Sequence, residues 1–322
     1  MHPISTISRR EFAIGAGLAT AAALISPRRL MGAARAAGGD EGVVSLMKRQ
    51  AAAAKISTQP LRGNISVLFG AGGNIAVLHG PDGKILVDAG ISTARRQVAP
   101  ALAAISADPI RFLINSHWHF DHTDGNEWLH AEGALIIAQE NTRRRLANST
   151  RVEGWQFTFP PSPAGALPII DFKQTLKLHL NHTTLLLEAF RPAHTDSDIL
   201  VEFVEPDVIH VGDIWWNGHY PFIDYSTGGS IDGTIQAVES ALARVKDSTI
   251  IIPGHGPVGD RAQLSEFHTM LTTVRSRIAT LKQQGSSLAA CVAEKPTLEF
   301  DHKFGHFLMA PADFVGMVYA GV

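Results

Sequence analysis

The chain has 322 residues, of which 45% are hydrophobic and 18% charged, and its formal net charge at pH 7 is −2. This length and apolar content suit one large α/β domain, or two smaller ones, with a sizeable core. The single cysteine, Cys291, excludes an intrachain disulfide and is expected to be buried and inert. The slightly acidic balance disfavours nucleic acid as a partner.

Residues 1–36 are typical of an export signal. Ser8-Arg9-Arg10-Glu11-Phe12 precedes an apolar run of small residues, and Ala34-Arg35-Ala36 follows it. The paired arginines resemble a twin-arginine signal, and the apolar run is too short to stay in a membrane. An amphipathic or disordered tail is the alternative. We expect cleavage after Ala36 and a periplasmic protein without a membrane anchor, with a formal charge of about −6 once the signal's +4 is removed.

Residues 37–60 are alanine-rich and lack a clear core face, which indicates a leader segment or short helix before a fold that begins near Leu61. Apolar runs at 65–69, 75–78 and 85–87, separated by glycine-rich turns, predict an antiparallel meander. The turn at 70–74 contains a GxGG pattern, but no helix opens after it, so a phosphate-binding loop is disfavoured. A helix at 93–105 and a strand at 110–114 follow.

The later pattern alternates between strands and helices. Strands are predicted at 135–138, 175–180, 184–190, 199–204, 208–211 and 249–252, and helices at 125–131, 140–147, 231–245 and 262–283. This order predicts an α/β fold with two sheets and helices outside them. Residues 150–168 are either a flap over a site or a hairpin whose aromatic side chains cover the core. Residues 286–322 are predicted to form a packed C-terminal tail, with a dimer contact or a pocket wall as alternatives.

The stretch His117-Trp118-His119-Phe120-Asp121-His122 predicts a metal site. Alternate side chains of an extended chain share a face, so His117 and His119 can point at one cation. A turn at Phe120 can bring Asp121 and His122 to a neighbouring position, and such nitrogen and oxygen donors suit zinc. Three later apolar strands each end in a polar residue with small neighbours, which we take as further ligands: His194, Asp213 and His255.

The motifs HxHxDH, AHTD, GD and PGHG, in this order and each after a strand, resemble those of the metallo-β-lactamase fold superfamily of metallohydrolases. The resemblance implies a four-layer αββα sandwich of two mixed sheets with outer helices, in a domain spanning residues 61–285. Carried over by position, it implies that His117, His119 and His194 bind a first metal, that Asp121, His122 and His255 bind a second, and that Asp213 bridges them. It also implies that Asp88 supports the site, for which a simple turn aspartate is the alternative.

The aspartate expected at the bridging position narrows the range of activities that the superfamily offers. Its zinc β-lactamases generally have cysteine or serine there, whereas glyoxalase II-like thioesterases and lactonases keep the aspartate. We hypothesise a hydrolase with two zinc ions, or iron or manganese, in which a metal-bridging hydroxide oriented by Asp121 attacks the carbonyl of a small lactam, lactone, ester or thioester. A one-iron oxidoreductase like the persulfide dioxygenases and a non-catalytic accessory protein on the same fold are the alternatives. The sequence does not indicate an oligomeric state.

Aromatic residues near the motifs predict the walls of a substrate pocket. The tryptophans that follow Asp213 could instead pack beneath it. The predicted pocket residues are Trp155, Trp215, Trp216, His219 and Tyr220.

Overall fold

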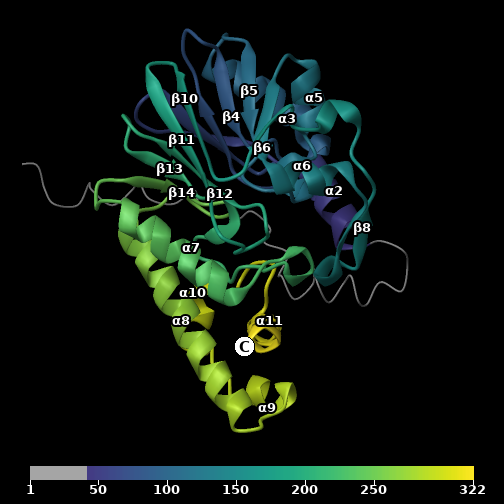
Figure 1. The fold of residues 1–322 in the computed structure, drawn as a ribbon, viewed down its shortest axis with the longest axis vertical. Helices are drawn as coiled ribbons and strands as arrows, with labels where there is room; N and C mark the ends of the chain where they lie inside the picture. Colours follow the sequence, from purple (N-terminus) through teal and green to yellow (C-terminus); the bar gives the residue numbers. More distant parts are fainter. Residues whose placement is uncertain (1–41) are drawn as a thin grey trace, which may run out of the picture.

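The computed structural model describes residues 42–322, and the predicted export signal lies outside them. Two mixed β-sheets pack against each other, and helices cover their outer faces (Figure 1). The predicted fold class is confirmed. None of the helices in the described part of the chain combines the length and the apolar character needed to cross a membrane.

The first sheet has seven strands in the order β1-β2-β3-β4-β5-β6-β9. Strands β1 to β4 pair antiparallel, whereas β5, β6 and β9 join in parallel after β4. The strands are β1 (Ser57–Pro60), β2 (Ile65–Phe69), β3 (Ile75–Leu78), β4 (Lys84–Val87), β5 (Ile110–Ile114), β6 (Leu135–Gln139) and β9 (Ile170–Phe172).

The second sheet has five strands in the order β10-β11-β12-β13-β14, antiparallel except for the last pair. A separate hairpin, β7 with β8, lies in the region predicted as a flap. These strands are β10 (Thr175–Leu180), β11 (Thr183–Ala189), β12 (Ile199–Phe203), β13 (Val208–His210), β14 (Ile250–Ile252), β7 (Thr150–Val152) and β8 (Phe157–Phe159).

Helices α2, α3 and α5 pack on the first sheet, whereas α7, α8 and α11 belong to the core on the outer side of the second sheet (Figure 1). The helices are α2 (Val43–Ala53), α3 (Arg95–Ile105), α4 (Phe120–Thr123), α5 (Asn126–Ala131), α6 (Glu140–Ala147), α7 (Ile231–Arg244), α8 (Arg261–Gln283), α9 (Leu288–Ala293), α10 (Asp301–Phe304) and α11 (Pro311–Gly321).

The alternation of side chains along the strands explains the layers. In β4, Ile85 and Val87 face the second sheet, while Leu86 between them faces the helices. Both sides of such a strand are buried, so its sequence is apolar throughout. The predicted strands agree with the observed ones to within one residue at each end, because these apolar runs stop at glycine, proline or polar turn residues.

The short helix that was one of the two expectations for residues 37–60 is present, but the packed structure starts earlier than expected. Helix α2 buries Val44, Met47 and Ala51 against the first sheet, and β1 pairs with β2 at the edge of that sheet. The packed structure therefore begins before Leu61. Only a narrow stripe of the alanine-rich helix is buried, and all four residues of β1 are exposed, so neither element has a strong apolar pattern.

The C-terminal residues pack into the core formed by α7 and α8. Phe314 of α11 is fully buried, and its ring stacks on that of Tyr220 at a centroid distance of 4.5 Å. The tail is thus a structural part of the molecule.

Replacing Phe314 with Ala should lower the free energy of unfolding by about 3–5 kcal/mol, because a large buried ring is lost and leaves a cavity. Urea denaturation followed by circular dichroism measures this change. Leu298→Ala is the control, because Leu298 is 63% exposed, and should change stability by less than about 0.5 kcal/mol. Equal effects of the two variants would contradict the packing described for α11.

Candidate metal centre

Segments that follow four strands bring the seven predicted ligands together. His117 and His119 follow β5, and Asp121 and His122 lie in the short helix α4. His194 follows β11, and the 3-10 helix Gly212–Ile214 after β13 carries Asp213. His255 follows β14. All seven side chains are buried.

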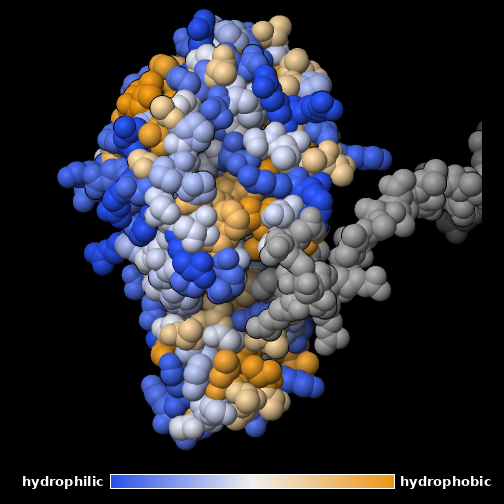
Figure 2. All heavy atoms as spheres, turned by 90° about the vertical axis from the view of Figure 1, so that its right-hand side faces the viewer, coloured by the Kyte–Doolittle hydropathy of each residue, from blue (hydrophilic) through white to orange (hydrophobic). Residues whose placement is uncertain are grey.

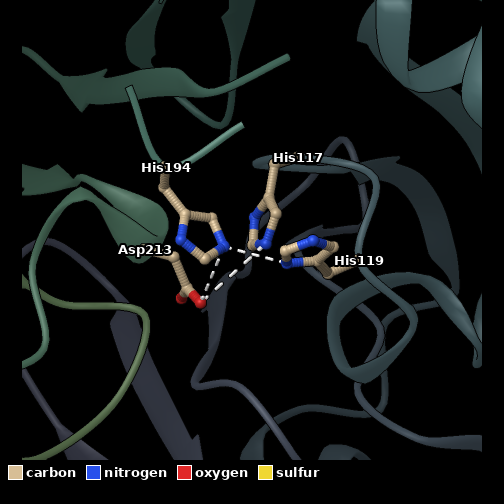
Figure 3. Close-up of side chains that lie close together, drawn as sticks. All are labelled: His117, His119, His194 and Asp213. Atoms are coloured by element: carbon tan, nitrogen blue, oxygen red, sulfur yellow. Dashed lines mark hydrogen bonds and ion pairs between the residues drawn. The ribbon is translucent and has the colours of Figure 1, made fainter. Parts of the chain in front are cut away.

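The first group consists of His117, His119, His194 and Asp213, whose donor atoms lie within 4.8 Å of one another. Figure 3 shows the three rings and the carboxylate pointing toward one another. His194 Nε2 lies 2.8 Å from His119 Nδ1 and 3.4 Å from Asp213 Oδ2. His117 Nε2 is 3.9 Å from the same oxygen.

The second group consists of Asp121, His122 and His255. His255 Nε2 lies 3.2 Å from Asp121 Oδ2, and His122 Nε2 lies 3.6 Å from it. Asp213 faces this group as well, with Oδ1 3.2 Å from His122 Nε2 and Oδ2 3.4 Å from His255 Nε2. The carboxylate therefore lies between the two groups, where the resemblance placed a bridging ligand.

The outer ring nitrogens of three histidines are held by hydrogen bonds. His194 Nδ1 donates to the carbonyl of Phe222 at 2.7 Å, which leaves Nε2 without a proton and turned to the centre. His122 Nδ1 lies 2.7 Å from Asp88 Oδ2, and His119 Nε2 lies 3.1 Å from Asp224 Oδ2. The protein thus fixes both the ring orientation and the tautomer that a metal ligand needs.

Asp88 supports two ligands at once. Besides His122, its carboxylate accepts bonds from the amide and the hydroxyl of Ser116, both at 2.7 Å, and the Ser116 hydroxyl lies 3.0 Å from His117 Nδ1. Asp88 is fully buried. It is therefore placed as a support of the site and is not an exposed turn residue.

Asp224 is a site residue that the sequence did not reveal. Its carboxylate contacts His119 and accepts a hydroxyl bond of 2.6 Å from Thr227, and its amide donates to the carbonyl of His194. Asp224 thereby ties the loops of two ligands together. It lies in an irregular segment just before the 3-10 helix Tyr225–Thr227 and belongs to no motif, so no signal in the sequence distinguished it.

The turn at residues 70–74 has a role in the site that the sequence also did not reveal. A Cβ on Gly73 would lie 2.2 Å from the His122 ring, and one on Gly72 would lie 2.6 Å from the carbonyl oxygen of Asp121. Asn74 donates to the carbonyls of Pro253 and Gly256, on either side of the His255 loop. The GxGG pattern was the available signal, and it marks close packing against the ligand loops.

The ligand histidines differ in the direction of their pKa shifts, according to how burial and neighbouring charges act on each ring. Burial lowers the pKa of His194 to about 4 and holds the pKa of His117 well below its ordinary value, so both rings are neutral donors. Burial also acts on His255, but the carboxylates of Asp213 and Asp121 outweigh it and raise the pKa to about 9. Conversely, His255 and His122 overcome the effect of burial on Asp213 and hold its pKa well below the usual range. The ionised carboxylates require positive charge at the centre, from protons on these rings or from bound cations.

The donor atoms fit divalent metal ions. Within residues 42–322, the buried atoms His117 Nε2, His122 Nε2, His255 Nε2 and Asp213 Oδ1 have no hydrogen-bond partner. Such orphaned donors and acceptors are costly unless something binds them. Donors about 2.0–2.1 Å from a tetrahedral zinc ion are roughly 3.3 Å apart, and the contacts above lie on both sides of that value.

A cavity of about 410 Å³ opens from the centre, with Asp121 and Asp213 at its inner end. Trp155 and Trp216, two of the predicted pocket residues, line it. The other predicted pocket residues lie elsewhere, which corrects the pocket prediction. Trp215 packs in the core, Tyr220 stacks on Phe314, and His219 stacks on Phe307 outside the cavity wall.

Both interpretations of the flap region hold in part. Trp155, at the turn of the β7–β8 hairpin, packs on His119 and Phe222, with ring centroids 4.8 Å and 5.4 Å away, and faces the cavity. Phe157 packs against the core on the first sheet, whereas Phe159, like Trp155, packs against the cores on both sheets. One residue of the hairpin therefore reaches the site while the others cover the core.

Comparison with known proteins agrees with this geometry. Residues 68–255, more than half of the chain, match the family model of the metallo-beta-lactamase superfamily. A hydroxyacylglutathione hydrolase of Polaromonas sp. (strain JS666 / ATCC BAA-500) is 27% identical over 157 residues, which are 48% of this chain and 52% of that protein.

Solved structures share the fold. An inverting sec-alkylsulfatase from Pseudomonas sp. superposes with a TM-score of 0.62 at 17% identity, over 90% of this chain and 54% of the sulfatase. A metallo-beta-lactamase from Pontibacter korlensis gives 0.52 at 17% identity, over 67% of this chain and 93% of the lactamase. The chain thus spans about half the length of the curated hydrolase and of the sulfatase that it matches.

Replacing Asp224 with Asn should weaken metal binding by about 10- to 100-fold, because the charged partner that orients His119 is lost. Competition with a chromophoric chelator measures the affinity. Asp313→Asn is the matched control: it removes an exposed carboxylate at the cavity and should leave the affinity unchanged. An Asp224→Asn protein with wild-type affinity would show that His119 needs no such support.

Replacing Gly254 with Ala should displace Asp213, because the new Cβ would lie 1.8 Å from Asp213 Oδ1 and 2.8 Å from the Gly212 backbone. We expect metal affinity to fall by at least about tenfold. In Gly316→Ala, the control, the added Cβ has nothing within 4 Å and the affinity should be unaffected. Metal content after dialysis, compared between the two variants, is the measurement, and equal content would contradict this packing of Asp213.

Proposed function

The chain belongs to the metallo-beta-lactamase superfamily, and on that premise we propose that it is a metal-dependent hydrolase. Water would attack the carbonyl carbon of a small lactam, lactone, ester or thioester, and the bond from that carbon to the leaving nitrogen, oxygen or sulfur would break. One observation carries the proposal. Two buried groups of nitrogen and oxygen donors share Asp213 and lie at the inner end of a cavity large enough for a small ligand.

We further propose two zinc ions as the cofactor. His117, His119 and His194 would hold one and Asp121, His122 and His255 the other, with Asp213 between them. The mixed imidazole and carboxylate set supports zinc, and iron or manganese are the alternatives for the same donors. When bound, such cations lower the pKa of water and polarise a carbonyl oxygen.

The chain's own residues would position the reactants. Asp121 lines the cavity and directs Oδ2 to His255 at 3.2 Å. The charges of His122 and His255 outweigh the effect of burial and lower its pKa, and bound cations would supply the same positive charge in place of the ring protons. Asp121 would therefore be ionised and could accept a proton from attacking water through Oδ1. Trp155 and Trp216 wall the cavity and exclude bulk water from the bond that is cleaved.

A nucleophile from the protein is not needed. Cys291 is fully buried among apolar residues of the C-terminal core and does not line the cavity. The second donor group favours a hydrolase over a one-iron oxidoreductase, which would require the first group alone. From the sequence, we also propose that residues 1–36 direct export to the periplasm.

Replacing Asp213 with Asn should lower metal content and hydrolysis together, with kcat/KM of an ester or thioester reduced by more than about 100-fold, because one carboxylate serves both donor groups. Treatment with a chelator should have the same effect and be reversed by zinc. Asp247→Asn is the control, since its side chain is 98% exposed. Full activity of a protein shown to be metal-free by elemental analysis would refute the proposed function.

A further inference from the structure

The cavity beside the metal centre has an unusual charge balance. None of the described residues that line it is a lysine, arginine or histidine, whereas five are acidic. Asp121 and Asp213 face the metal centre, and Asp224 is held by His119. The other two, Glu153 and Asp313, are exposed and lie farther out along the wall.

One cation of the flap, Arg151, offsets the charge of Glu153 from outside the cavity and leaves the other four acidic residues unchanged. Arg151 bonds to Glu153 at 2.7 Å and to Gln156 at 3.2 Å, and it does not line the cavity. Positive charge inside the cavity would therefore come from the metal ions at its inner end. A carboxylate or sulfate elsewhere on a substrate would lose its hydration and meet acidic side chains instead of a cation.

The remaining walls are apolar and leave space. Ala312, Gly316 and Ala320 follow one another at intervals of four along α11, so they share one face of that helix, and all three line the cavity. A Cβ on Gly316 would have nothing within 4 Å, which shows that this face is open. Val43 and Met47 of α2 also line the cavity. Figure 2 shows hydrophobic surface in the middle of one face of the molecule, bordered by hydrophilic residues.

We infer that this cavity selects carbonyl compounds that are neutral or positively charged, with an apolar chain or ring lying against α11, and that it disfavours compounds with a second, anionic group. The inference rests on the proposed function and specifies its substrate class. A volume of about 410 Å³ suits a small body of this kind.

Three p-nitrophenyl esters with six-carbon acyl chains test the charge selection with zinc-loaded protein: the hexanoate, the 6-aminohexanoate and the adipate monoester, which end in a methyl, an ammonium and a carboxylate group. We expect kcat/KM for the first two to exceed that for the adipate by at least about tenfold. Asp313→Lys should raise the rate with the adipate several-fold, because it places a cation at the wall. An adipate rate equal to or above that of the hexanoate would overturn the inference and leave the hydrolase proposal intact.

The acyl chain length tests the α11 wall. The wild-type protein should prefer the hexanoate to the acetate, and Gly316→Leu should lower kcat/KM for the hexanoate by at least about fivefold while sparing the acetate. Ala289→Leu is the control, since Ala289 is exposed on α9 and does not line the cavity. Equal effects of Gly316→Leu on both esters would overturn the proposed location of the apolar chain.

If no ester is cleaved, the binding of three ketones tests the inference independently of hydrolysis. 2-Octanone, 8-amino-2-octanone and 7-oxooctanoate carry the same carbonyl group and differ in charge, and tryptophan fluorescence or calorimetry reports their binding. Tighter binding of the first two, weakened by Gly316→Leu, would sustain the inference although the hydrolase proposal failed. Equal or tighter binding of 7-oxooctanoate, or no binding of any of the three, would overturn it.

Discussion

The site depends on one buried carboxylate. Asp213 is almost fully buried, and its two oxygens lie between the nitrogens of four histidines. An isolated carboxylate in such a place would be very unfavourable, and it stays ionised because the opposite charges around it outweigh the loss of hydration. The loops that bring these charges are therefore constrained as a set. Gly254, whose Cβ would collide with Asp213, is one consequence.

The two sheets hold the ligand loops in fixed positions around Asp213. His117, His194 and His255 each follow a strand, and the three strands belong to two different sheets. Contacts between the loops then lock the sheets together at this edge, since Asn74 from the first sheet donates to carbonyls beside His255. Ligands fixed by both a strand end and an outer hydrogen bond lose little entropy when a metal binds.

Most strands and the metal ligands could be predicted from the sequence, because their signals lie in short local patterns. Apolar runs that end at small or polar residues define the strands, and HxHxDH carries four donors in six positions. Asp224 escaped prediction because its role arises from a contact with His119, 105 residues away, and its immediate neighbours carry no pattern. Trp215 and Trp216 could not be told apart from the sequence, because both rings are buried in the same core and only Trp216 also lines the cavity.

The chemistry and the selection of substrate come from different parts of the chain. All seven donors lie within residues 68–255, the range shared with the superfamily. Helices α2 and α11, which supply part of the apolar cavity wall, lie outside that range on either side. The names of relatives that match the shared range therefore say little about the substrate of this chain. The small residues Ala312, Gly316 and Ala320 on one face of α11 leave space for an apolar group. This part of the cavity wall is therefore formed by the C-terminal segment, outside the shared range.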